Sequence, residues 1–127
     1  MRFLALIVLL CAPLAAAAQA AAPYEVEMLQ KIAPCLVQGA PADWFRIYVI
    51  VELEKPGDET GGVRYLVTRQ EKPDQPEAFT PCNIRGPAMD VLAMREHQVP
   101  DRRGWTGARI VLLRDGSFSL SYDFPTQ

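Results

Sequence analysis

The sequence predicts an α+β domain, in which an antiparallel sheet of four to five strands packs against two helices. Three observations predict this class: apolar residues at helical spacing in residues 24–33, strict apolar alternation in residues 45–53, and an Asp-Gly hairpin pattern in residues 109–124. The expected order is helix, strand, strand, an uncertain third strand, helix, strand, strand. Helices on one face of an antiparallel sheet bury the apolar sides of both kinds of element.

The beginning of the chain has the pattern of a secretory signal peptide. Arg2 supplies a positive charge, residues 3–10 are an unbroken apolar run, and Ala18-Gln19-Ala20 is a small-x-small cleavage site. The apolar run is shorter than the roughly 20 residues that a membrane-spanning helix needs. We therefore expect residues 1–20 to be cleaved. Residues 21–127 are then a single domain, located in the periplasm or secreted, with no integral membrane span.

The charge balance argues against a nucleic-acid partner. The chain has 13 basic and 15 acidic residues, and loss of Arg2 with the signal peptide makes the remaining domain slightly more acidic. A surface that binds nucleic-acid phosphates needs a surplus of Lys and Arg. No phosphate-binding glycine motif is present either, because Gly57, Gly61 and Gly62 are not followed by the Lys-Ser/Thr pair that such a loop requires.

Cleavage of the signal peptide leaves two of the three cysteines, Cys35 and Cys82. An even number of cysteines in an exported chain favours a disulfide. This bond would close a loop of nearly fifty residues and stabilise the fold by about 4 kcal/mol in the chain-entropy model. The alternative is two separate buried thiols. A metal site is not expected, because the two cysteines and His97 are widely spaced and lack a fourth soft ligand.

Two helices are expected. Residues 24–33 carry apolar side chains at helical spacing. Pro34 is expected to disturb this helix near Ala33, because proline lacks an amide proton; the alternative is that the turn continues through Cys35 and Leu36. The second helix begins at Pro87, a first-turn position at which the missing donor costs little. Its charged tail, residues 95–97, ends it.

Two strands and an uncertain segment are expected between the helices. Residues 45–53 alternate strictly, which predicts a half-buried strand with its odd-numbered side chains in the core. Residues 63–70 read as its hairpin partner. Residues 71–77 are polar and proline-rich, which predicts a connection. Residues 78–84 are either a short strand or irregular, and Pro81 argues for an edge strand or none.

The closing hairpin is expected to turn at residues 115–116. An Asp-Gly pair predicts a two-residue type I′ turn, because both central residues of that turn need positive φ. Such a turn pairs Leu113 with Phe118. One strand then turns its large side chains to the core: Phe118, Leu120, Tyr122 and Phe124. On the opposite face, Ile110 and Leu112 lie beside a stripe of serines.

Few residues support catalysis. His97 lies in the charged tail of a helix, where it has no positioned partner of the kind that a general base needs. The serines of the closing strand (Ser117, Ser119 and Ser121) lack an adjacent base and an oxyanion hole. Glu52 and Glu54 share a predicted strand face, but paired carboxylates also describe any polar strand end. We therefore expect no enzymatic activity, no cofactor and no metal.

The strand face opposite the core is the strongest functional signal. Trp44, Tyr48 and Ile50 fall on it, and aromatic side chains with charged neighbours are typical of protein interfaces. The alternative is that helices or the proline-rich segment cover this face as a second core. The candidate interface residues are Trp44, Arg46, Tyr48, Ile50, Glu52, Glu54, Asp58, Glu59, Ile110 and Leu112. The four acidic members would steer a basic partner.

Several local patterns resemble the YezG-like immunity protein family. They are the short amphipathic helix, Asp43-Trp44 opening a strand, and Trp105 followed by an aliphatic strand, an Asp-Gly turn and the Tyr-Asp-Phe of residues 122–124. The resemblance implies a non-enzymatic antitoxin that binds a cognate toxin used in bacterial competition. The signal peptide and the two cysteines depart from the usual cytoplasmic form.

Together these features predict a periplasmic immunity or inhibitor protein that neutralises a cognate toxin or effector protein. The toxin would attack the cell wall, the membrane or another periplasmic target. The alternative prediction is a periplasmic binding or structural accessory module of an envelope complex.

Overall fold

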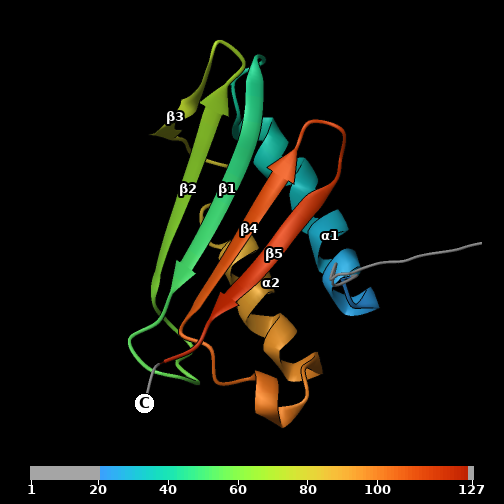
Figure 1. Cartoon of the computed structure of the whole chain (residues 1–127), viewed down its shortest axis with the longest axis vertical. Coiled ribbons are helices and arrows are strands. Elements are labelled where there is room, and N and C mark those ends of the chain that lie inside the picture. The colour runs from blue at the N-terminus through green and yellow to red at the C-terminus, as the bar shows by residue number, and fades with distance from the viewer. Residues whose placement is uncertain (1–20, 126–127) are drawn as a thin grey trace, which may run out of the picture.

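The computed structural model describes residues 21–125. The predicted signal peptide lies outside the described residues. Five antiparallel strands form one sheet in the order β3-β2-β1-β4-β5. Figure 1 shows both α-helices on the same side of this sheet. The architecture confirms the predicted α+β class and the predicted order of elements.

The elements have the following bounds. The helices are α1 (Pro23–Gly39) and α2 (Gly86–Met94), and two short 3-10 helices follow, η1 (Arg95–His97) and η2 (Pro100–Arg102). The strands are β1 (Trp44–Glu52), β2 (Gly62–Arg69), β3 (Lys72–Ala78), β4 (Gly107–Leu113) and β5 (Phe118–Asp123).

Helix α1 is longer than predicted. It begins at Pro23 and continues through Pro34 to Gly39. Proline removes only one backbone hydrogen bond, and this ring lies on the exposed side of the helix. The opposite side of α1 packs into the core through Met28, Leu29, Ile32 and Leu36. Burial of this stripe on both sides of Pro34 outweighs the lost bond.

Strand β3 occupies the segment that was predicted to be a connection. It pairs with β2 through Leu66 opposite Ala78 and Arg69 opposite Lys72. Because β3 is at the edge of the sheet, its two prolines do not have to donate to a further strand. The fifth strand therefore lies in residues 72–78, and residues 79–84 are irregular.

The β4–β5 turn is one residue wider than the predicted type I′ turn. The amide of Gly116 donates to the carbonyl of Leu113 (3.0 Å), and the amide of Leu113 donates to the carbonyl of Ser117 (2.8 Å). Gly116 has φ 89, as in a three-residue hairpin loop with a glycine bulge. Asp115 stabilises this loop by accepting hydrogen bonds from the amide and the hydroxyl of Ser117, at 2.9 and 2.6 Å. These bonds lower the pKa of Asp115.

The core lies between the helices and one face of the sheet. Its central strand contributes Ile47, Val49 and Val51, which are at most 3% exposed. Trp105 is fully buried and donates its indole N–H to the side-chain oxygen of Gln98, at 2.9 Å. This hydrogen bond satisfies the polar atom of the largest core side chain.

The predicted disulfide is present. It joins Cys35 of α1 to Cys82, with the two Cα atoms 4.9 Å apart. The amide of Cys82 also donates to the carbonyl of Cys35, at 3.0 Å. The two segments pack so closely that a Cβ on Gly39 would overlap the backbone of Thr80. The bond thus fixes the C-terminal half of α1 to the segment between β3 and α2.

Replacing Cys35 and Cys82 by serine is expected to lower the free energy of unfolding by about 4 kcal/mol, because the open chain gains entropy when it unfolds. Urea unfolding of the variant and of the oxidised protein measures this difference. Reduced wild-type protein is the control and should match the double variant. Equal midpoints for all three proteins would contradict the stabilising role.

Substitution of Gly116 by alanine is expected to cost about 1 kcal/mol, because its positive φ strains any residue with a Cβ. Gly104→Ala is the matched control, since a Cβ there meets nothing within 4 Å. Thermal unfolding compares the two variants. A stability of Gly116→Ala equal to that of the wild-type protein and of Gly104→Ala would show that the turn does not need glycine.

Candidate protein-binding surface

The face of the sheet opposite the helices is uncovered within the described residues (Figure 1). Tyr48 lies at its centre on β1, between Leu66 of β2 and Val111 of β4. Ile50, next along β1 on the same face, lies between two arginines of the same neighbouring strands. This surface, the open face, has the following members along β1, β2, β4 and β5: Arg46, Tyr48, Ile50, Glu52, Arg64, Leu66, Thr68, Arg109, Val111, Leu113, Ser119 and Ser121.

A shallow groove of about 350 Å³ crosses the open face. Its floor includes Tyr48, Ile50 and Leu66, and its wall is formed by Pro73 and Pro76 of β3. Neither proline has a rotatable backbone φ or an amide donor. The groove therefore combines an apolar floor with a conformationally restricted wall. The two prolines of this wall have no backbone N–H that a partner would have to satisfy.

Charged side chains surround this apolar centre. Arg46 packs over the ring of Phe45, at 4.7 Å, and its amide donates to Thr68 Oγ1, at 3.2 Å. Arg64 lies 3.7 Å from Glu52 in an ion pair whose two side chains are mostly exposed. Exposed ion pairs contribute little to stability, so these charges are available to a partner.

Trp44 was predicted to lie on the open face, and this prediction is wrong. A β-bulge between Trp44 and Arg46 shifts the alternation of β1 at its start. The indole is consequently 8% exposed and belongs to the core. Arg114 covers it, with its guanidinium 5.0 Å from the ring and Nη1 donating to the Trp44 carbonyl at 2.7 Å.

Ile110 and Leu112 were also predicted to lie on the open face, and both are buried in the core. The wider turn pairs Ile110 with Leu120 and Leu112 with Phe118. This register turns Val111 and Leu113 outward instead. Those two residues, with Leu66 and the arginines of β2 and β4, are members of the open face that the sequence argument missed. If the Asp-Gly pair had been assigned to a three-residue turn, the sequence would have placed Val111 and Leu113 of β4 on the open face.

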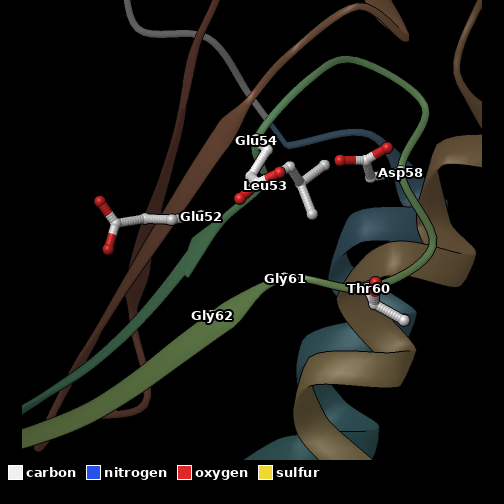
Figure 2. A pocket seen from close by; sticks show the side chains of 7 residues that line it. All are labelled: Glu52, Leu53, Glu54, Asp58, Thr60, Gly61 and Gly62. Atoms are coloured by element: carbon white, nitrogen blue, oxygen red, sulfur yellow. The ribbon is translucent and has the colours of Figure 1, made fainter.

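The four predicted acidic residues lie at the end of β1 and in the loop that joins β1 to β2. Figure 2 shows three of them, Glu52, Glu54 and Asp58. Strand β1 ends at Glu52, so Glu54 does not share a strand face with it. Figure 2 shows Glu52 directed away from the hollow of about 650 Å³ that Glu54 and Asp58 line. Asp58 accepts a hydrogen bond from the amide of Lys55, at 3.2 Å. Glu59 is exposed in the same loop. Residues 21–125 hold no cluster of three or more His, Cys, Asp or Glu suited to a metal ion.

Two of the remaining candidates for chemistry, His97 and Ser117, have structural partners. His97 stacks on the ring of Tyr24, with centroids 5.7 Å apart. Ser117 donates to Asp115 in the β4–β5 turn. Ser119 and Ser121 are exposed on β5, as the predicted serine stripe requires.

A partly buried hydrogen bond joins β5 to the beginning of α1. The hydroxyl of Tyr122 donates to Glu25 Oε2 at 2.6 Å, and the other oxygen of Glu25 accepts from the amide of Ala22 at 2.9 Å. Burial, followed by the bond to Glu25, raises the pKa of Tyr122 well above its ordinary value of 10.0. The phenol therefore stays neutral in the folded protein when an unfolded chain would lose the proton.

In comparisons with known proteins, no family model and no curated protein matches the chain. Within the described part of the chain, neither α-helix combines the length and apolar character needed to cross a membrane.

Replacing Tyr122 by phenylalanine is expected to cost about 1–2 kcal/mol at neutral pH, because Glu25 loses a buried donor. Wild-type stability is also expected to fall as pH rises above about 10, because only the unfolded chain ionises this phenol there. The variant should lose less over that range. Urea unfolding between pH 7 and 11 checks both effects, with Tyr48→Phe as the matched control. Identical alkaline behaviour in all three proteins would contradict the proposed linkage.

Proposed function

We propose that this protein is an exported, non-enzymatic inhibitor that binds a toxin and blocks it, as a periplasmic immunity protein does. The observation that supports the proposal best is the open face, where Tyr48, Ile50 and Leu66 form an apolar centre that neither helix of residues 21–125 covers. Exposed apolar patches with a polar rim mark protein-interaction sites.

The composition of the open face fits recognition of a folded protein. Tyrosine and arginine are the residue types most often found at the energetic centre of interfaces. Here Tyr48 lies between strands that also carry Arg64 and Arg109, one on each side of Ile50. The sheet fixes the backbone of these residues, so the conformational entropy lost on binding is confined to their side chains. A stiff platform of this kind inhibits by covering a partner's active site and needs no chemistry of its own.

The acidic loop supports a basic partner. Glu54, Asp58 and Glu59 follow β1 directly, and Glu52 lies on the adjoining end of the open face. Charges at the edge of an interface mainly accelerate encounter with an oppositely charged protein. The proposed toxin therefore has a basic region beside the surface that contacts Tyr48 and Ile50.

The disulfide supports export. Disulfides persist in oxidising compartments such as the periplasm and are rare in cytosolic proteins. An inhibitor in the periplasm meets toxins that arrive from outside the cell. The proposed target is therefore a toxin that acts on the wall, the membrane or another periplasmic component.

Binding to the products of neighbouring genes tests this proposal. We expect one exported neighbour to co-purify with the protein and to lose its toxic activity in the complex. Ile50→Asp should weaken this complex at least about tenfold, because it removes an apolar contact from the centre of the open face and adds a carboxylate that can pair with the flanking Arg64 and Arg109. Ile84→Asp is the matched control, since Ile84 is 57% exposed and is not part of the open face. Calorimetry measures both affinities, and thermal unfolding confirms that the variants fold.

Two results would contradict the proposal. Equal weakening by Ile50→Asp and Ile84→Asp would mean that the open face is not the contact surface. A neighbour that binds tightly but has no toxic activity would favour the alternative, an accessory module of an envelope complex.

A further inference from the structure

We propose a second binding site: the free edge of β5 accepts an extended segment of a partner protein as a sixth strand. The segment would lie in the groove between β5 and α1. This site adjoins the open face, with Ser119 and Ser121 at the border of both. It is built from backbone groups of β5, so the inference does not depend on the proposed inhibitor function.

Within residues 21–125, the backbone of β5 has hydrogen-bonding groups without a partner. Among these residues the strand is at the edge of the sheet and pairs with β4 alone. The carbonyls of Ser117 and Asp123 both accept bonds from the β4 side, at 2.8 Å each. Because the direction of backbone groups alternates along a strand, the N–H and C=O of Phe118, Leu120 and Tyr122 point away from β4. The backbone N–H and C=O groups of these three residues can therefore form β-sheet hydrogen bonds with an additional strand.

The two edges of the sheet differ in how they are protected. Natural sheets block unwanted pairing with prolines and charged residues on their edge strands. Strand β3 has both, namely Pro73 and Pro76 together with Lys72, Asp74 and Glu77. The stretch Phe118–Tyr122 of β5 has neither. Of the two edge strands, only β5 has a stretch that lacks these protective residues. We take this difference to indicate that the β5 edge pairs with another strand.

A groove of about 1050 Å³ runs along this edge. It is lined by residues 118–122 of β5, by the first turn of α1 and by side chains between His97 and Arg102. Figure 1 shows the beginning of α1 on the free-edge side of β5. The helix therefore walls the groove on its far side. This geometry suits a single extended segment, which needs about 4.8 Å of spacing from β5, rather than the sheet of a second copy.

The lining of the groove also defines the chemistry of the segment. Its charged residues are nearly balanced: Arg102 is opposed by Glu25, whose carboxylate already accepts two hydrogen bonds. Phe118 and Leu120 are half-buried on the core side, and Val99 is 62% exposed beside them. The matching partner is thus an uncharged stretch of about five residues with apolar side chains at every second position.

Hydrogen exchange with a probe peptide tests the site. The probe is the N-acetylated, C-amidated heptapeptide Ser-Val-Ser-Val-Ser-Val-Ser, added in millimolar excess to the oxidised protein. Without peptide, the amides of Phe118, Leu120 and Tyr122 should exchange freely, while those of Ser119 and Ser121 are protected by β4. With peptide, the three free amides should slow at least about tenfold.

A pair of variants isolates the backbone contribution. Leu120→Pro removes one outward N–H and leaves the bonds to β4 in place, so it should abolish the peptide-dependent protection at Phe118 and Tyr122. Leu120→Val keeps the N–H and should preserve the protection. Ile50→Asp should also preserve it, which separates this site from the open face.

Three outcomes would overturn the proposal. Unchanged exchange of the wild-type amides at saturating peptide would show that the edge does not accept a strand. Protection of Phe118, Leu120 and Tyr122 before peptide is added would show that the edge is already covered. Protection that rises with protein concentration would identify a second copy, instead of a partner segment, as the occupant.

Discussion

Each side chain of the sheet points either toward the two helices or into the open face. The register of its strand determines which of the two sides it occupies. Residues 47, 49 and 51 of β1 are at most 3% exposed, while their neighbours Tyr48 and Ile50 remain half-buried on the uncovered side. Because side chains alternate with a period of two, a shift of one residue exchanges the two sides completely. The core, the open face and the free groups of β5 all follow from this constraint.

Helix α1 depends on two attachments that lie toward opposite ends of its length. Near its beginning, Glu25 receives the hydroxyl of Tyr122 from β5, and in its C-terminal half Cys35 is bonded to Cys82. These contacts hold the helix across the core-facing side of the sheet. They also leave space between α1 and the free edge of β5, where the groove lies. The same attachments therefore stabilise the core and shape a surface outside it.

The two proposed binding sites recognise different features of a partner. The open face presents side chains, with Tyr48 and Ile50 as its centre, and suits a folded surface of matching shape. The edge of β5 presents backbone groups and suits an extended segment of loosely defined sequence. A protein that used both would hold its partner at a face and along an adjoining strand. Affinity gained from such linked contacts exceeds that of either site alone.

Local patterns in the sequence were sufficient to predict the α+β class, the order of elements, the first hairpin and the disulfide. Hydrophobic periodicity and an even number of cysteines after the predicted cleavage can both be read along the chain. Three features were decided only by tertiary structure: the path of α1 through Pro34, the strand at residues 72–78, and the inward turn of Trp44, Ile110 and Leu112. Each depends on partners distant in sequence or on the hydrogen bonds of one turn. Burial outweighs the proline in α1, an edge position makes β3 possible, and a bulge and a wider loop reset the alternation. The sequence by itself thus determined four of the five strands, whereas the tertiary structure added the strand at residues 72–78 and decided which side of each strand is left for a partner.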